Sequence, residues 1–193
     1  MKIILASASP RRKELLELIG LNFIIKPGNI EEKMDENLSI SERVEKLALQ
    51  KAEDIALSVQ AESLVIGADT IVEIDGEILG KPKDKDDAKR MLNLLSGKNH
   101  NVITAVAFVP TSKNYSTVIS YESTKVKFKE LSDTEIDNYV NTGEPMDKAG
   151  AYAIQGLGVM IVEGIIGCYT NVVGLPVPLL TRILAKEYNI KLL

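Results

Sequence analysis

The chain has 193 residues, which is enough for one domain or for two small lobes around a shared sheet. Its formal charge is −4, from 23 basic and 27 acidic residues mixed along the sequence, so no basic stripe indicates a partner that is a nucleic-acid polymer. The absence of tryptophan and the presence of only three phenylalanines also leave few aromatic platforms for single-stranded nucleic acid. An anionic ligand must therefore be bound by a local cluster of cations.

Cysteine usage and hydropathy predict the compartment. Cys168 is the single cysteine, so it forms no internal disulfide, and no Cys/His spacing indicates structural zinc. Ala6-Ser7-Ala8 imitates a signal-peptidase site, but the apolar stretch before it is too short for a signal peptide. The most apolar tract, residues 150–167, is interrupted by Gln155, Glu163 and several glycines. We therefore expect a soluble, cytoplasmic protein with no membrane partner.

Apolar stretches of strand length alternate with amphipathic stretches of helix length along the chain. The predicted strands are residues 2–6, 23–25, 64–74, 77–79, 100–109 and 117–128, followed by a hairpin candidate at 158–168. The predicted helices are residues 10–20, 39–59, 84–96, 132–143 and the segment after 176. Capping-box patterns mark two helix starts, Ser39 with Glu42 and Ser132 with Glu135.

This alternation, without internal repeats or a long linker, favours an α/β fold with a mixed sheet and helices on its faces. Residues 64–74 are apolar almost throughout, which predicts a strand covered on both faces. Because no clean boundary is visible, we expect a single domain over residues 1–193. If that domain has two lobes, the hinge-like places are residues 27–37 and 110–117.

The first candidate site lies where the first strand turns into a helix. Ser9 is expected as the N-cap and Pro10 as the first helical residue, and Arg11 and Arg12 follow in the first turn. A helix N-terminus attracts anions, so arginines there are electrostatically misplaced unless an anion is bound. Arginine pairs are often ordinary solvated helix residues, but this position after a strand and a serine-rich turn favours a phosphate site.

Two further candidates are charged residues at apolar positions. Lys51 falls near the centre of the apolar face of the long helix, so it either snorkels to an edge or meets a phosphate in a polar cavity. Asp69 lies within an otherwise apolar strand and requires a metal, a cation or a proton. The following hairpin returns the chain to Lys81, which we expect near the same sheet edge. Such a pair is either structural or a base beside a phosphate-binding cation.

Two loops carry weaker signals. Glu31 and Glu32 offer hard oxygen ligands to Mg²⁺, although acidic loops are mostly solvated. Gln155 is a lone amide in a glycine-rich segment, able both to donate and to accept hydrogen bonds. An amide of this kind suits recognition of a base edge, and it equally suits satisfaction of backbone groups in the loop. Composition does not separate these alternatives.

Short motifs occur in a fixed order over nearly the whole chain. They are Ser7-Ala8-Ser9-Pro10-Arg11-Arg12, Ala48-Leu49-Gln50-Lys51-Ala52, Gly67-Ala68-Asp69-Thr70, Gly80-Lys81-Pro82, Ser96-Gly97 with His100, the segment 144–152, Ile154-Gln155-Gly156 and Val173-Gly174-Leu175-Pro176. Together they closely resemble the Maf family. The resemblance implies an elongated mixed sheet with two lobes and a central cleft, like the ITPases, and frequent homodimerisation. It also implies hydrolysis of a nucleoside triphosphate to the monophosphate and pyrophosphate with Mg²⁺ or Mn²⁺.

The same resemblance assigns residues to roles. Asp69 is implied to be the catalytic proton acceptor that activates water and, together with Glu32, to organise the metal. The residues implied to bind the triphosphate are Ser9, Arg11, Arg12, Lys51 and Lys81. One departure from the family pattern is Pro178, which lies two residues beyond Pro176 and touches no predicted site residue.

Three positions indicate the substrate. Family members that prefer 7-methyl-GTP carry an aromatic residue, a glutamine and a glutamate where this chain has Arg11, Thr70 and Gln155. The set found here resembles the branch that acts on dTTP and UTP, and an amide pairs with both an acceptor and a donor of a pyrimidine. The alternatives are a nucleotide-binding regulator of septum formation and a house-cleaning pyrophosphatase for other modified nucleotides. Asp69 and Lys81 favour an enzyme, a hydrolase acting on acid anhydrides.

Overall fold

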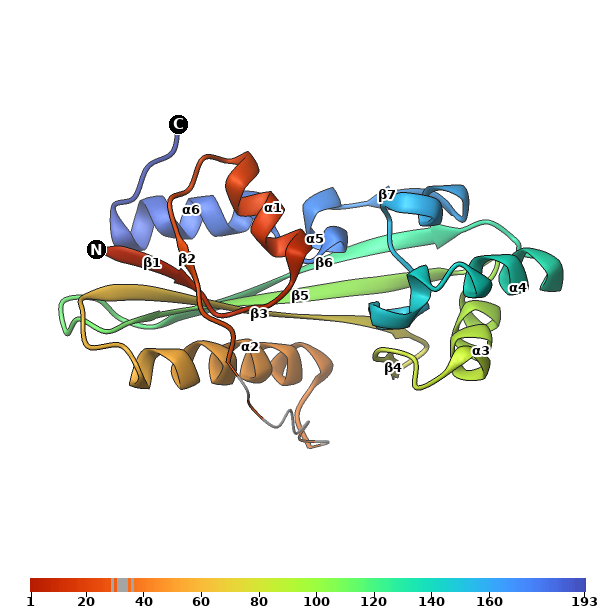
Figure 1. The fold of residues 1–193 in the computed structure, drawn as a ribbon, viewed down its shortest axis with the longest axis horizontal. Coiled ribbons are helices and arrows are strands. Elements are labelled where there is room, and N and C mark those ends of the chain that lie inside the picture. The colour runs from red at the N-terminus through yellow and green to blue at the C-terminus, as the bar shows by residue number, and fades with distance from the viewer. Residues whose placement is uncertain (29, 31–34, 36) are drawn as a thin grey trace. The chain divides into compact units, whose positions relative to one another are not determined.

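The computed structural model describes residues 1–28, 30, 35 and 37–193 (Figure 1). The strands are β1 (Lys2–Leu5), β2 (Ile24–Ile25), β3 (Ser63–Ile74), β4 (Glu77–Leu79), β5 (Asn99–Pro110), β6 (Val118–Phe128) and β7 (Val162–Ile166). The α-helices are α1 (Pro10–Leu18), α2 (Ile40–Leu57), α3 (Lys85–Leu95), α4 (Asp133–Asn141), α5 (Tyr169–Val173) and α6 (Val177–Tyr188). Three short 3₁₀ helices are η1 (Glu144–Asp147), η2 (Ala149–Ala151) and η3 (Gly156–Met160). None of the helices in this described part of the chain is long and apolar enough to cross a membrane.

The strands form one mixed sheet in the order β2-β1-β3-β5-β6-β7, and β4 pairs with β3. β1 runs parallel to both of its neighbours, with Ile4 opposite Ile24 on one side and Val65 on the other. Parallel neighbours require crossover connections, and α1 and α2 provide them. β4 and β7 are antiparallel to β3 and β6. The predicted mixed α/β sheet flanked by helices is therefore confirmed.

The chain divides into two compact units. The first unit contains Met1–Asp69, Thr104–Glu122 and Gly174–Leu193, and the second contains Thr70–Ile103 and Ser123–Val173. The boundaries fall within β3, β5 and β6 and directly after α5. Residues 110–117, one of the two predicted hinge places, belong to the first unit, and residues 29, 31–34 and 36 of the other place lie outside the described residues.

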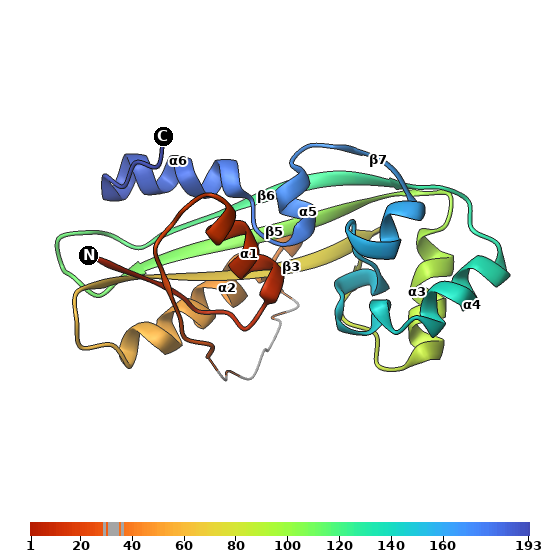
Figure 2. The same cartoon turned by 45° about the horizontal axis from the view of Figure 1, so that its top comes forward.

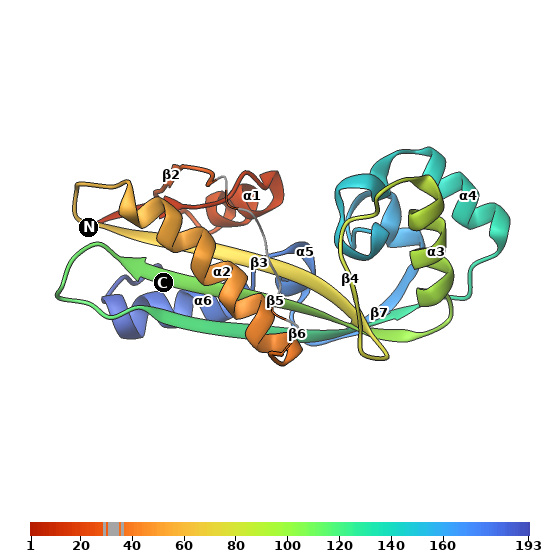
Figure 3. The same ribbon diagram turned by 90° about the horizontal axis from the view of Figure 1, so that it is seen from below.

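In the first unit, helices cover both faces of the sheet. α2 lies on one face, and α1 and α6 lie on the other (Figures 1 and 3). Every residue of β3 from Ser63 to Asp69 is buried, which confirms the prediction of a strand covered on both sides. The largest side chains in this core are Leu5, Leu16, Leu47, Leu64, Ile66 and Phe108.

α2 approaches β3 unusually closely at Gly67. A Cβ atom on Gly67 would lie 2.3 Å from the carbonyl oxygen of Ala48 and 2.8 Å from the backbone nitrogen of Ala52. Ala48 and Ala52 are one helical turn apart and are both fully buried. Glycine in the strand and alanines on the helix therefore fix where α2 crosses β3.

Both predicted capping boxes are formed. Glu42 donates its backbone N–H to Ser39 Oγ at 3.4 Å, and Ser39 donates its backbone N–H to Glu42 Oε2 at 2.8 Å. The same reciprocal pair joins Ser132 and Glu135 at the start of α4. Ser9 is the N-cap of α1 as predicted, but its side chain makes no capping hydrogen bond.

The second unit has its own core, formed by residues of the strands, α3, α4 and the segment 151–161. α3 and α4 lie side by side in this unit (Figure 2). His100 is buried there, in edge-to-face contact with Phe128 and Tyr152 at ring-centroid distances of 4.9 and 5.3 Å. Its Nε2 forms a 2.7 Å hydrogen bond with the Tyr152 hydroxyl. Burial lowers the pKa of His100 to about 4, so the imidazole is neutral near pH 7. The one histidine of the chain is thus a core residue.

The predicted hairpin at residues 158–168 is wrong. Residues 156–160 form η3, and β7 pairs with β6, where Lys125 lies opposite Ile166. Gly158 lies against the backbone of Ala153, because a Cβ atom on Gly158 would be 1.7 Å from the Ala153 carbonyl oxygen. The segment between these two residues therefore turns back on itself and does not extend as a strand. The short elements η1, η2 and α5 were not predicted, because they span too few residues to show a helical period.

Replacing Gly67 by alanine should destabilise the protein, because the new methyl group meets backbone atoms of α2. We expect the free energy of unfolding to fall by about 1–3 kcal/mol, the usual cost of overpacking. Chemical denaturation measures this change. Gly164→Ala is the matched control, since a Cβ atom at Gly164 meets no atom within 4 Å. Equal losses in the two variants would contradict the close helix–strand contact.

Candidate functional site

The centre of the candidate site is an ion pair between α2 and β3. Gly67 and Asp69 point to the same face of the strand, because side chains alternate along it. Ala48, Lys51 and Ala52 share one face of α2. The contact at Gly67 therefore brings Lys51 to Asp69, with Nζ 2.6 Å from Oδ1.

This ion pair is largely removed from water. The Lys51 and Asp69 side chains are 17% and 11% exposed. Lys51 thus does not snorkel to the surface but donates a charge-assisted hydrogen bond to the carboxylate. Asp69 has the cationic partner that the sequence required, and this partner is Lys51. The expected position of Lys81 near the same sheet edge stays a prediction, since Lys81 belongs to the second unit.

Arg12 connects three segments of the first unit. Its Nε donates to the carbonyl of Gly174 at 2.9 Å, and its Nη1 donates to the carbonyl of Ala68 at 2.8 Å and to Ser7 Oγ at 3.2 Å. The planar guanidinium suits this task, because its donors point in fixed directions. Arg12 therefore holds the turn before α1 against the residue that precedes Asp69.

The N-terminus of α1 belongs to the same unit and has the features of an anion site. Arg11 and Arg12 lie in its first turn, which contains no acidic residue, and both are partly buried. Ser9 donates its backbone N–H to Ser7 Oγ at 3.2 Å, which orders the turn. Backbone N–H groups, the helix dipole and the arginines all favour a bound phosphate.

Three further predicted residues belong to the second unit. Thr70 follows Asp69 in β3, and the exposed Lys81 comes two residues after β4. Gln155 is partly exposed and is the N-cap of η3. A backbone hydrogen bond of 3.0 Å from Gly150 N to Gly80 O ties the Lys81 turn to the segment that leads to Gln155.

The predicted metal ligands are only partly described. Glu31 and Glu32 lie outside the described residues. Within residues 1–28, 30, 35 and 37–193, no group of three or more His, Cys, Asp or Glu side chains is arranged to bind a metal ion. Mg²⁺ needs only one or two carboxylates when phosphates and water complete its shell, so a single buried carboxylate such as Asp69 fits this requirement.

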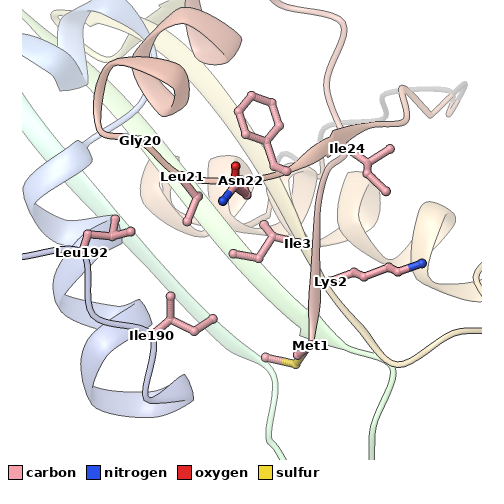
Figure 4. Close-up of a pocket in the computed structure, with 10 residues that line it drawn as sticks. Met1, Lys2, Ile3, Gly20, Leu21, Asn22, Ile24, Ile190 and Leu192 are labelled. Atoms are coloured by element: carbon pink, nitrogen blue, oxygen red, sulfur yellow. The ribbon is translucent and has the colours of Figure 1, made fainter.

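A separate hollow in the first unit contains none of these residues. It has a volume of about 540 Å³ (Figure 4). Its lining is mostly apolar and consists of Met1, Lys2, Ile3, Gly20, Leu21, Asn22, Phe23, Ile24, Ile190 and Leu192. Among its lining side chains only Lys2 is charged and none is a carboxylate, so we do not assign the site to it.

Sequence reasoning missed two features of the site. The first is the pairing of Lys51 with Asp69, although the signal was present in the alanines beside Lys51 and the glycine before Asp69. The second is the anchoring of Arg12 by Gly174, which lies 162 residues away. A backbone carbonyl acceptor leaves no signal in residue identity, so only the folded chain shows it.

Replacing Lys51 by methionine should destabilise the protein, because the buried Asp69 carboxylate loses its partner. We expect a loss of about 3–5 kcal/mol in the free energy of unfolding. The double variant Lys51→Met/Asp69→Asn should lose less, since no unpaired charge remains. Denaturant titration of both variants measures these losses.

The matched control is Lys46→Met on the same helix. Lys46 pairs with Asp35 at the surface, where the side chains are 43% and 39% exposed and water screens the charges, so its loss should cost much less than that of Lys51. A Lys51 variant no less stable than the Lys46 variant would contradict the importance of the buried pair.

Comparison with known proteins places this chain in a family. A family model described as "Maf-like protein" matches residues 2–187. The dTTP/UTP pyrophosphatase of Thermoanaerobacter sp. is 51% identical over 193 residues and covers all of both chains. The dTTP/UTP pyrophosphatase of Acetivibrio thermocellus is 52% identical over 199 residues, covering 100% of this chain and 98% of that protein.

A solved structure shows a weaker similarity. The nucleoside-triphosphatase, or dITP/XTP pyrophosphatase, of Mycobacterium abscessus is 18% identical with a TM-score of 0.43, covering 68% of this chain and 76% of that one. A similarity of this size carries no conclusion. The family model and the relatives that are about 50% identical over the full length do support a conclusion. The chain belongs to the Maf-like protein family.

Proposed function

We propose that this protein is a nucleoside triphosphate pyrophosphatase that hydrolyses dTTP and UTP to the monophosphate and pyrophosphate. The relatives named dTTP/UTP pyrophosphatase support this assignment through their identity over the whole chain. The structural observation that carries it is the buried ion pair of Lys51 and Asp69. Asp69 directly follows Ala68, whose backbone carbonyl accepts a hydrogen bond from Arg12. A carboxylate beside fixed cations is what hydrolysis of a phosphoanhydride requires.

The first unit supplies an anion site for the phosphates. The N-terminus of α1 presents the positive end of the helix dipole, and Arg11 and Arg12 in its first turn add positive charge. In this proposal Lys51 and Lys81 neutralise the triphosphate as point charges. Arg12 is already oriented by Gly174 and Ala68, so its planar guanidinium is preorganised for binding.

Asp69 is the proposed catalytic base. It accepts a proton from a water molecule, whose oxygen attacks the α-phosphorus in line with the leaving group. The bond from the α-phosphorus to the bridging oxygen breaks, and pyrophosphate leaves with the bonding electrons. Since Lys51 binds Oδ1, we assign the water proton to Oδ2. The hydrogen bond from Lys51 fixes the orientation of the carboxylate.

A divalent cation completes the proposed site. Asp69, with Glu32 from outside the described residues, would bind Mg²⁺ or Mn²⁺. The ion, when bound, supplies positive charge to the phosphate oxygens. Hard oxygen donors such as carboxylates are the ligands that these ions prefer.

Three residues are proposed to select the base. Gln155 can donate to a carbonyl oxygen of a pyrimidine and accept from its ring N–H. Arg11 and Thr70 accompany it in the pattern that resembles enzymes acting on dTTP and UTP. We also propose that the enzyme works in the cytoplasm, where free nucleotides are present, and that it forms a homodimer.

Replacing Asp69 by asparagine should remove most of the turnover and retain nucleotide binding, because the amide keeps the shape but cannot accept the proton. We expect pyrophosphate release from dTTP and UTP to fall about 10²–10⁴-fold. The assay measures pyrophosphate from a panel of nucleoside triphosphates with Mg²⁺ or Mn²⁺, beside a binding titration.

The matched control is Asp54→Asn, an exposed position on α2, which should retain full activity. Near-full turnover in the Asp69 variant would refute its role as the base. Tight nucleotide binding by the unaltered protein without any turnover would instead favour a nucleotide-binding regulator.

Replacing Gln155 by glutamate should weaken recognition of pyrimidines. An ionised carboxylate only accepts hydrogen bonds, so the carbonyl oxygen of the base loses its donor. We expect KM for UTP to rise about 10-fold or more, as for the loss of one hydrogen bond that leaves a polar atom unpaired. Steady-state kinetics with UTP and dTTP measure it. An unchanged KM would exclude Gln155 from base recognition.

A further inference from the structure

The carboxylate of Glu144 connects α4 to the start of η3. Glu144 is the first residue of η1 and lies three residues after the end of α4, the helix that contains Tyr139. Its Oε1 accepts from the Tyr139 hydroxyl at 2.8 Å and from the backbone N–H of Gly158 at 3.1 Å. Its Oε2 accepts from the backbone N–H of Leu157 at 3.0 Å. One side chain therefore satisfies three donors from two elements.

The Tyr139 hydroxyl extends this arrangement to the other side of Gln155. It accepts from the backbone N–H of Ala153 at 3.3 Å while it donates to Glu144. Ala153 precedes Gln155 by two residues, and Leu157 follows it by two. We call Tyr139, Glu144 and the three backbone N–H groups that they bind the Glu144 network. It anchors the chain on both sides of Gln155.

Close packing restricts the same segment. Gly156 has a φ of +63°, and a Cβ atom there would lie 2.6 Å from Glu144 Oε2. The left-handed conformation and the short distance both favour glycine at this position. The residue directly after Gln155 therefore has its backbone fixed against the Glu144 carboxylate.

The hydrogen bonds keep Glu144 ionised. Burial alone would raise the pKa of Glu144, but the donors from Leu157, Tyr139 and Gly158 outweigh burial and lower it. Burial, together with the hydrogen bond to Glu144, raises the pKa of Tyr139, so the phenol remains a donor near neutral pH. An ionised carboxylate is an acceptor at both oxygens, which matches the three donors that face it.

We propose that Glu144 is a positioning residue that fixes Gln155 for recognition of the nucleotide base. The proposal rests on the function proposed above, in which Gln155 contacts the base. Glu144 itself does not touch the substrate. It acts by holding the backbone of residues 153–158 in the one conformation that places Gln155 at the N-cap of η3.

The test is the variant Glu144→Gln. A glutamine side chain has one acceptor oxygen and one donor NH₂ group, so it cannot accept from all three donors. Its NH₂ group would face a backbone N–H, either that of Leu157 or that of Gly158. We expect KM for dTTP and UTP to rise about 10-fold, kcat to change less than about 3-fold, and the preference for UTP over GTP to fall about 10-fold. A merely structural role would lower the active fraction, and therefore kcat, without changing KM or preference.

Two further variants separate position from chemistry. Glu163→Gln makes the same change in the second unit at an exposed pair with Lys127, where both side chains are over half exposed, and should leave KM and preference unchanged. Tyr139→Phe retains Glu144 but removes the hydroxyl, so it should raise KM by less than Glu144→Gln does. It also provides the test if Glu144→Gln fails to fold.

Hydrogen–deuterium exchange tests the network without any substrate. The amides of Ala153, Leu157 and Gly158 should exchange at least 10-fold faster in Glu144→Gln than in the unaltered protein, and no faster in Glu163→Gln. If the unaltered protein hydrolyses neither dTTP nor UTP, the proposed function fails, whatever the exchange rates. If it hydrolyses both, and Glu144→Gln keeps the same KM, preference and exchange rates, the role of Glu144 is overturned.

Discussion

The contact between α2 and β3 at Gly67 is the constraint on which the rest of the candidate site depends. No side chain separates the helix from the strand there, because a Cβ atom at Gly67 would lie 2.3 Å from a backbone oxygen of Ala48. At this separation a lysine on the helix face reaches a carboxylate two residues further along the strand, and Lys51 meets Asp69 at 2.6 Å. The charged pair is thus a consequence of the small residues beside it. Burial of both side chains then makes each charge depend on the other.

The hydrogen bonds of Arg12 connect β3 to the N-terminus of α1. Its hydrogen bonds to Ser7, Ala68 and Gly174 join residues that are far apart in the chain. The helix end that we assign to the phosphates is therefore linked to the peptide that precedes the proposed base. Because the guanidinium is charged, planar and already oriented, little conformational freedom is lost when a phosphate binds beside it.

In the second unit, the Gln155 side-chain amide lies in a glycine-rich segment whose backbone must be held in one conformation. Glycines give residues 153–158 the backbone conformation they need but leave the unfolded segment many alternatives. The Glu144 network restricts those alternatives by binding three backbone N–H groups around Gln155. His100, by contrast, packs in the core against Phe128 and forms a hydrogen bond with Tyr152. This histidine is part of the motifs that resemble the family, and in this chain its role is packing.

Sequence by itself determined most of the helices and strands, because periodicity, caps and turns are local properties. The long strands, the capping boxes at Ser39 and Ser132, and the hairpin after β3 were all predicted. It also identified Lys51 and Asp69 as charges in apolar surroundings. Only the tertiary structure decided that Lys51 pairs with Asp69 and that β7 pairs with β6. Those outcomes depend on distances between residues remote in the chain and on backbone acceptors such as the Gly174 carbonyl. The identity of a residue indicates neither its distance to a remote residue nor the partner of its backbone carbonyl.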